Sequence, residues 1–164
     1  MHDRDLDDLT GIYADPLVTA TLGGIRDAEW VRQYLNNQMA HWERHGFGFW
    51  TMRDPDTGTF VGRGGLRHAT IEGQIAIEVG YGLIPQFWGS GLATELACES
   101  VRVAFAELHL DELVCFTLPT NLASRRVMEK AGFRYERDII YADLPHVLCR
   151  LTRDQWRDRK EDSE

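Results

Sequence analysis

The most constraining feature of the chain is an alternating strand that leads through a glycine-rich turn into a helix. Residues Gln74–Ile84 alternate between large apolar and small side chains, and Glu78 is the one carboxylate on the small face. Pro85 ends the alternation, and Gly89 and Gly91 indicate a tight turn before a helical period. Such a turn leaves backbone N–H groups open, and the helix start adds further donors. The pattern therefore predicts a cradle for an anion such as phosphate.

The cradle differs from a nucleotide-binding P-loop. Leu92 and Ala93 stand where that motif needs Lys and Ser or Thr after its last glycine. Magnesium binding is therefore not implied. A plain turn without a ligand is the alternative for this motif taken alone.

Helical and strand patterns alternate through the middle of the chain, which predicts an α/β or α+β fold with a mixed sheet. Asp27 is a candidate N-cap for a helix, and Gly132 is a candidate left-handed cap at the end of another. The expected strands cover residues 47–52, 59–66, 74–84 and 113–118, with two more between 135 and 151. The expected helices lie within the first fifty residues, after Leu92 and after Asn121.

Composition excludes several classes of protein. The chain has 18 Lys and Arg against 26 Asp and Glu, a net charge of −8, which argues against a broad basic surface for nucleic acid. No apolar run approaches the roughly 18–20 residues of a membrane span, and the charged N-terminus lacks a signal sequence. The three cysteines are widely spaced and form no C-x-x-C pair. We expect a cytoplasmic protein that binds neither nucleic acid nor membrane.

Two further patterns suggest ligands but have simpler interpretations. The glycines of Gly62–Gly65 do not complete a dinucleotide fingerprint, because Arg67 falls at the third glycine position. That segment is better explained as a strand with a bulge or a close backbone approach. His41 and His45 lie four residues apart, but no third metal ligand is evident nearby, so we predict no metal site.

A second motif, Asn121–Phe133, again places polar residues at a helix start and ends at a glycine. Together with the strand Glu78–Tyr81 and the turn Trp88–Glu95, it resembles the GNAT superfamily of acetyl-CoA-dependent N-acetyltransferases. The likeness is greatest to the RimJ/RimL branch, which acetylates ribosomal proteins and small amines. It extends over roughly residues 2–151. The resemblance implies the GNAT fold: a mixed, mostly antiparallel sheet that is splayed at the acetyl-CoA site and flanked by helices.

The resemblance also implies how the co-substrate acetyl-CoA is bound. The backbone of Leu83, Ile84 and Pro85 would hydrogen-bond the pantetheine arm where two strands splay apart. The amides of the glycine turn would hold the pyrophosphate, and Asn121 would contact the pantetheine or acetyl end. The turn residues concerned are Trp88, Gly89, Ser90, Gly91, Leu92, Ala93 and Thr94.

The adenosine phosphate would need cationic side chains. Arg125, Arg126 and Lys130 of the second motif are the candidates, because a chain of net charge −8 must build a positive field locally. The alternative for each arginine is a solvated helix face.

The implied reaction is direct attack of a neutral amine on the thioester, without a covalent enzyme intermediate. Deprotonation near pH 7 costs about 4–5 kcal/mol for a lysine and about 1–1.5 kcal/mol for an α-amino group, so a base is useful. Glu78, acting through water, is the candidate base; a structural carboxylate is the alternative. Ser124 is the candidate proton donor to the thiolate, because Met128 replaces the tyrosine that many GNAT enzymes have there. Tyr81 and Tyr141 are weaker candidates.

The chain departs from the family at its start. Family members usually open with a strand, whereas this sequence begins within the first helical segment, so either the first strand is missing or the sequence starts after it. A homodimer partner could cover the sheet edge left exposed. We expect one GNAT domain over residues 1–152 and a frayed, charged C-terminal tail over 153–164.

The leading hypothesis is an N-acetyltransferase whose acceptor is a primary amine, either a protein N-terminus or a small amine. The alternative is a non-catalytic acyl-CoA-binding or regulatory module with the same fold. The segments expected to form the acceptor pocket, Leu22–Arg26, His41–Phe49 and Tyr141–His146, carry no recognisable specificity signature.

Overall fold

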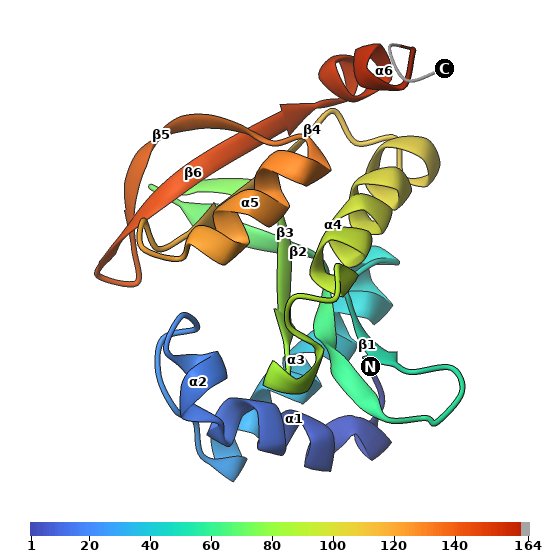
Figure 1. The fold of residues 1–164 in the computed structure, drawn as a ribbon, viewed down its shortest axis with the longest axis vertical. Helices are drawn as coiled ribbons and strands as arrows, with labels where there is room; N and C mark the ends of the chain where they lie inside the picture. The colour runs from blue at the N-terminus through green and yellow to red at the C-terminus, as the bar shows by residue number, and fades with distance from the viewer. Residues whose placement is uncertain (162–164) are drawn as a thin grey trace. The chain divides into compact units, whose positions relative to one another are not determined.

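The structure, a computed structural model, describes residues 1–161 of the 164-residue chain. It has a mixed α/β fold with one six-stranded sheet in the order β1-β2-β3-β4-β6-β5, which confirms the expected class (Figure 1). The strands are β1 (Phe49–Arg53), β2 (Phe60–Ile71), β3 (Gln74–Leu83), β4 (Glu112–Thr117), β5 (Arg134–Tyr141) and β6 (Leu144–Thr152). The α-helices are α1 (Leu6–Ala14), α2 (Pro16–Thr19), α3 (Ala28–His45), α4 (Leu92–Arg102), α5 (Leu122–Ala131) and α6 (Arg153–Glu161).

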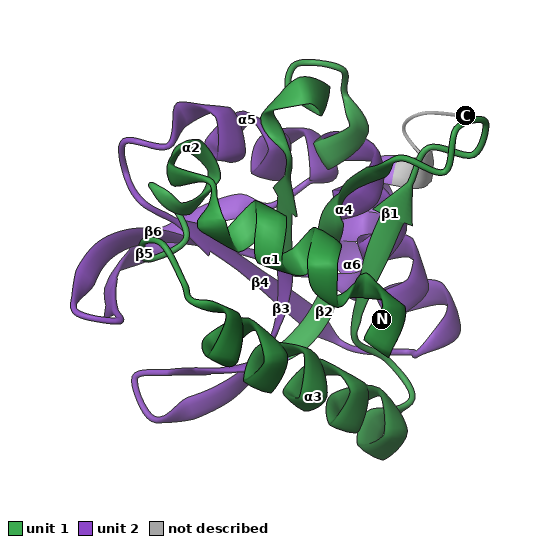
Figure 2. Cartoon of the chain, turned by 90° about the horizontal axis from the view of Figure 1, so that it is seen from below, with its two compact units in different colours: residues 1–67, 80–93 green, residues 68–79, 94–164 purple. Residues whose placement is uncertain are grey.

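The chain forms two compact units, coloured green and purple in Figure 2. The first unit contains residues 1–67 and 80–93, and the second contains residues 68–79 and the chain from residue 94 onward. Strands β2 and β3 each contribute residues to both units.

Helices α2 and α3 of the first unit begin where short acidic side chains cap them. The Asp27 carboxylate accepts the N–H of Trp30 at 2.8 Å, which confirms the expected cap, and Asp15 accepts the N–H of Leu17 at 2.8 Å. Gly46, with φ of 71°, ends α3 in the left-handed conformation. The helices bury an apolar core formed by Leu9, Ile12, Tyr13, Val18, Val31, Leu35 and Phe60.

Strands β1 and β2 form the expected antiparallel hairpin. Phe49 lies opposite Gly65, and the register shifts between Met52, which pairs with Gly62, and Arg53, which pairs with Phe60. Val61 is therefore the extra, unpaired residue, so the irregularity is on β2, directly before the glycine segment. Strand β2 continues to Ile71, beyond the expected end at residue 66.

The glycines of β2 permit close approach of neighbouring backbone, which confirms that part of the prediction. A Cβ atom on Gly62 would collide with the carbonyl oxygen of Gly82. A Cβ atom on Gly65 would lie 2.5 Å from the carbonyl oxygen of Gly48. Neither position can accept a side chain without displacing backbone.

The second unit is built on antiparallel pairing of β4 with β6 and of β6 with β5. Strand β3 joins β4 in parallel, and the pair in register is Glu78 with Val114. Helix α4 continues as a π-helix over Val103–Glu107, and Gly132, with φ of 105°, caps α5 as expected. The core cluster consists of Ala69, Ile71, Val114, Ile139 and Leu148.

The expectation of a frayed segment after residue 152 is wrong for the part that the structure describes, because Arg153–Glu161 forms α6. Thr152 and Gln155 cap it reciprocally: the Thr152 N–H donates to Gln155 Oε1 at 3.0 Å, and the Gln155 N–H donates to Thr152 Oγ1 at 3.3 Å. Trp156 then packs against Phe105, with ring centroids 5.5 Å apart. Residues 162–164 of the expected tail lie outside the described residues.

In the part of the chain described here, no strand precedes Phe49, and β1 is an edge strand of the sheet. The homodimer that would cover such an edge stays a prediction. None of the described helices is long and apolar enough to cross a membrane.

Candidate functional site

The connection between β3 and α4 has the geometry of an anion-binding turn. A single 3₁₀ turn over Pro85–Phe87 is followed by Gly89 and Gly91, with φ of 75° and 88°. Both glycines therefore lie in the left-handed region, which other residues adopt at a cost. The Ser90 hydroxyl between them donates to the Phe87 carbonyl at 2.5 Å and holds the turn closed.

Several amides of this turn are available to a ligand, because they are not used in hydrogen bonds within the turn. Within the described chain, the amides of Gly89, Ser90 and Gly91 have no partner among the loop and turn hydrogen bonds. The first N–H groups of α4, from Leu92 onward, lack intrahelical partners as at any helix start. Successive unpaired N–H groups at the positive end of a helix dipole suit a phosphate.

Some of the backbone groups expected to bind coenzyme A are already used. The Trp88 amide donates to the Pro85 carbonyl at 3.1 Å, so the available amides begin at Gly89. The Trp88 indole, on a residue 52% exposed, donates to the Leu83 carbonyl at 2.8 Å. The Ile84 amide donates to the Val61 carbonyl at 3.0 Å. These bonds fix the end of β3, and its contact with the pantetheine arm stays a prediction.

Asn121 is the N-cap of α5 in the second unit. Its Oδ1 accepts the N–H of Ser124 at 3.1 Å, which leaves the Nδ2 amide hydrogens as its donors toward a ligand. The Ser124 hydroxyl lies 3.9 Å from the sulfur of Met128, one turn further along the helix. The structure therefore brings Asn121 and Ser124 together at one helix end.

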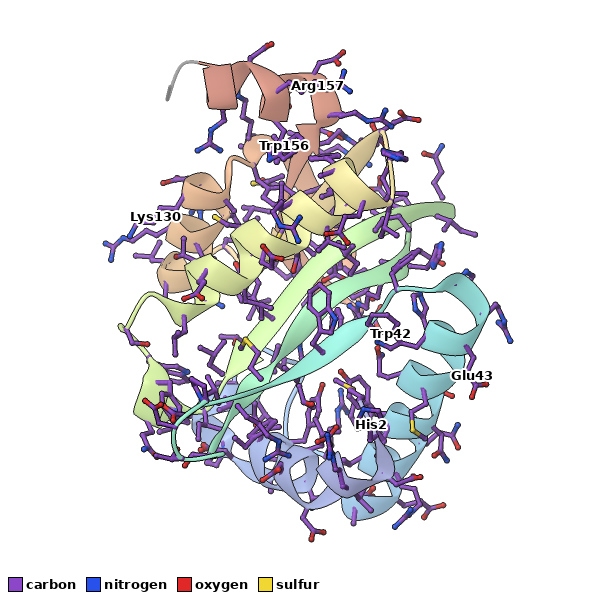
Figure 3. All side chains as sticks on the ribbon, turned by 90° about the vertical axis from the view of Figure 1, so that its right-hand side faces the viewer. His2, Trp42, Glu43, Lys130, Trp156 and Arg157 are labelled. Carbon is purple, nitrogen blue, oxygen red and sulfur yellow. The ribbon has the colours of Figure 1, made fainter. Side chains whose placement is uncertain are left out.

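The three cationic candidates all lie on α5. Arg125, Arg126 and Lys130 are exposed, and Figure 3 shows the Lys130 side chain extending away from the helix. Arg125 donates through Nη1 to the Pro119 carbonyl at 3.2 Å. Both the solvated-face alternative and the phosphate role agree with this exposure.

Glu78 is buried, with 5% of its surface exposed, on the part of β3 that pairs with β4 in the second unit. A carboxylate at this depth is held by interactions, because an unpaired buried charge is costly. Tyr141 packs its ring against Phe116 and His146, at 4.5 and 5.8 Å between centroids, which favours a packing role for it.

His41 and His45 lie on one face at the end of α3, as their spacing indicates. Their ring centroids are 4.6 Å apart, and His41 Nδ1 is 2.8 Å from the Phe47 carbonyl oxygen. Burial lowers the pKa of His41, and the hydrogen bond to Phe47 only partly opposes this. The His41 ring is therefore neutral near pH 7. Whether these histidines bind a metal is not tested, so the absence of a metal site stays a prediction.

Sequence reasoning missed a buried polar cluster in the first unit. The Arg63 side chain lies inside that unit, 6% exposed, and donates through Nη2 to the Tyr13 hydroxyl at 2.8 Å. Tyr34 packs edge-on against Tyr13, with centroids 5.1 Å apart. The available signal was an arginine inside an otherwise small and apolar strand, Phe60–Leu66, where charge is rarely buried.

Comparison with known proteins connects this geometry to a family. The family described as Acetyltransferase (GNAT) domain matches residues 1–134. The protein YkkB of Bacillus subtilis (strain 168) is 33% identical over 140 residues, which cover 85% of this chain and 81% of YkkB. The uncharacterized N-acetyltransferase YoaA of the same organism is 27% identical over 138 residues, covering 82% of this chain and 76% of YoaA. A structure of aminoglycoside acetyltransferase AAC(6')-Ib with coenzyme A superposes with a TM-score of 0.80 at 21% identity, covering 98% of this chain and 96% of that one, a likeness of fold.

Proposed function

This chain belongs to the acetyltransferase (GNAT) family and is an acetyl-CoA-dependent N-acetyltransferase, and we propose that it transfers the acetyl group directly to a primary amine. The acceptor is a protein N-terminus or a small amine, as in the RimJ/RimL branch that the motifs resemble. Family membership favours this reaction over the alternative of a non-catalytic acyl-CoA-binding module. The protein is expected to work in the cytoplasm.

The observation that carries the proposal is the turn between β3 and α4. Two glycines at positive φ leave consecutive amides without a loop hydrogen-bond partner at the start of a helix, an arrangement that can hold a diphosphate without a side-chain cation. In this proposal the pyrophosphate lies on the amides of Gly89–Thr94, and the pantetheine arm follows Leu83–Pro85. Asn121 donates through Nδ2 to the arm or the acetyl group.

Two side chains are proposed to move protons. Glu78 removes a proton from the acceptor ammonium through a water molecule, because only the neutral amine attacks the thioester. The attack forms the amide bond as the carbon–sulfur bond breaks. Ser124 donates to the leaving thiolate, in place of the tyrosine that Met128 replaces.

The test of cofactor binding is a matched pair of glycine substitutions. Gly91→Val places a β-branched residue at positive φ in the turn, and Gly58→Val does the same in the β1–β2 loop, where φ is 72°. Both variants should lose about 1–2 kcal/mol of stability. Only Gly91→Val should weaken coenzyme A binding, by about tenfold or more in calorimetry. Equal coenzyme A affinity in the two variants would remove the turn from the site.

The test of chemistry is thiol release from acetyl-CoA with a panel of peptides that differ in the first residue, together with small amines. The wild type should acetylate at least one class of acceptor. Glu78→Gln should lower kcat by about 100-fold or more and move the rising limb of the pH profile upward, because solvent must then deprotonate the amine. Tight coenzyme A binding with no turnover on any amine would instead support the binding-module alternative.

A further inference from the structure

The guanidinium of Arg63 in β2 has surroundings that the proposed chemistry does not explain. Its Nη2 donates to the Tyr13 hydroxyl, and its Cζ lies 5.5 Å from the Tyr13 ring centroid and 5.2 Å from that of Phe49. The groups that Arg63 contacts here carry no charge. Among the described residues, none of the hydrogen bonds or ion pairs of Arg63 involves a carboxylate.

Unsatisfied polar atoms collect in the same unit. Arg63 Nε and the Tyr34 hydroxyl are buried without a hydrogen-bond partner, and so are Arg26 Nε and Gln38 Oε1. Trp30 connects two of these residues, because its ring stacks on Tyr34 with centroids 5.4 Å apart and lies 5.0 Å from the Arg26 guanidinium. An unsatisfied buried donor costs about 1–3 kcal/mol, and more when it is charged. Donors retained at such a cost favour a ligand that supplies the missing acceptors.

Arg63 also keeps its charge. Burial works against the guanidinium, but the phenols of Tyr13 and Tyr34 raise the pKa of Arg63 above its ordinary value despite repulsion from Arg67. The carboxylates Asp5 and Asp8 of the same unit pair with Arg53 instead. The first unit therefore holds a buried positive charge that pairs with no carboxylate among the described residues.

The position of this charge suits an acceptor site. A Cβ atom on Gly82 would lie 3.6 Å from Arg63 Cζ and 3.3 Å from Leu22 Cδ1, so the guanidinium packs against the backbone of β3 at a position that has no side chain. Gly82 directly precedes Leu83, where the pantetheine arm is proposed to run. Leu22 and Arg26 belong to the segment expected to form the acceptor pocket.

We propose that Arg63 binds a carboxylate of the amine acceptor, so the substrates are amino carboxylates: molecules that carry a primary amine and a carboxylate. This inference rests on the proposed acetyltransferase function. A planar guanidinium with an unused Nε–H matches the two oxygens of a carboxylate and repels a purely cationic amine. The net charge of −8 does not oppose this, because a buried local charge governs the field at the site.

The experiment compares acceptors that differ only in that carboxylate. Amino carboxylates of increasing chain length are assayed beside their carboxamides by thiol release from acetyl-CoA, with rates expressed per neutral amine. The wild type should prefer the carboxylate by about tenfold or more in kcat/KM. Arg63→Met should abolish that preference, so that carboxylate and carboxamide are used with similar kcat/KM.

Arg53→Met is the matched control, because it removes the same group from the neighbouring strand; it should keep the preference for the carboxylate. Arg63→Lys retains the charge without the planar fork and should show a reduced preference, which keeps the test decisive if Arg63→Met does not fold. Equal use of carboxylate and carboxamide by the wild type, or an unchanged preference in Arg63→Met or Arg63→Lys, would overturn the inference and leave the acetyltransferase function intact. Binding of coenzyme A without acetylation of any amine would overturn the proposed function itself, and the inference with it.

Discussion

Two arginines on the neighbouring strands β1 and β2 have opposite electrostatic surroundings. Arg53 Nη2 lies 3.0 Å from Asp5 Oδ1 and 2.6 Å from Asp8 Oδ2, although its side chain is 35% exposed and water could solvate it. Arg63 is 6% exposed, and its hydrogen bond goes to the neutral hydroxyl of Tyr13. Arg53, which water can partly solvate, pairs with two carboxylates. Arg63, which is buried and needs a counter-ion more, has no carboxylate among its contacts.

This difference separates a structural charge from a functional one. The Arg53 pair satisfies Asp5, whose side chain is 1% exposed, so it stabilises the fold. Burying Arg63 without an anion lowers stability, and folding alone gives no reason to keep it. Sites that lower stability are commonly those where ligands bind.

The largest expected contrast is in stability. Arg53→Met should lower the free energy of unfolding by about 2 kcal/mol, because Asp5 stays buried with fewer partners, while solvent at Arg53 limits the loss. Arg63→Met should change it by less than about 1 kcal/mol, because the variant also removes an uncompensated buried charge. Urea denaturation of the two variants measures both values. A larger loss for Arg63→Met than for Arg53→Met would make Arg63 a structural residue.

The pH dependence of stability gives the next effect. Burial raises the pKa of Asp5, but hydrogen bonds from Arg53, the His2 amide and Thr51 outweigh burial and hold it below the ordinary 3.8. A carboxyl with a lowered native pKa stabilises the fold above its unfolded pKa, and that contribution is lost as the pH falls through the native value.

Asp5→Asn should therefore be less stable than wild type by about 1.5 kcal/mol near pH 7. The difference should shrink as the pH falls below about 4 and go on shrinking as the pH passes through the lowered native pKa of Asp5. Denaturation curves across this range test it, with Asp56→Asn, an exposed loop substitution, as control. A difference that does not depend on pH would mean that shape, not charge, makes Asp5 important.

Whether a feature could be predicted from the sequence depends on whether its residues are close together along the chain. The glycine turn acts through its backbone, and every part of it lies within a few consecutive residues, so Pro85, Gly89 and Gly91 were sufficient to locate it. The Asn121 cap and the Gly132 stop were predicted for the same reason. The helix after residue 152 is the exception: Thr152 and Gln155 form a local capping box, but the high charge of the residues that follow is typical of a frayed tail.

The Arg63 cluster could not be predicted in this way. Its members come from α1, α3 and β2, so their contacts arise only from tertiary packing. Alternation along β2 indicates which face Arg63 occupies, but not that Tyr13 and Tyr34 cover that face. The catalytic and coenzyme-binding roles assigned from the family motifs remain predictions, because proximity of side chains does not establish a reaction.

The last prediction compares the two tyrosines beside Arg63. Tyr13→Phe removes the acceptor of Arg63 Nη2 and should cost about 1–2 kcal/mol in unfolding free energy. Burial raises the pKa of Tyr34, and its hydroxyl makes no hydrogen bond of good geometry, so Tyr34→Phe should be neutral or stabilise the protein by up to about 1 kcal/mol. Tyr135→Phe, at a residue 61% exposed, is the surface control. Equal losses for Tyr13→Phe and Tyr34→Phe would mean that the Tyr34 hydroxyl already has an acceptor, and a cluster satisfied in this way would have no donors left for a carboxylate.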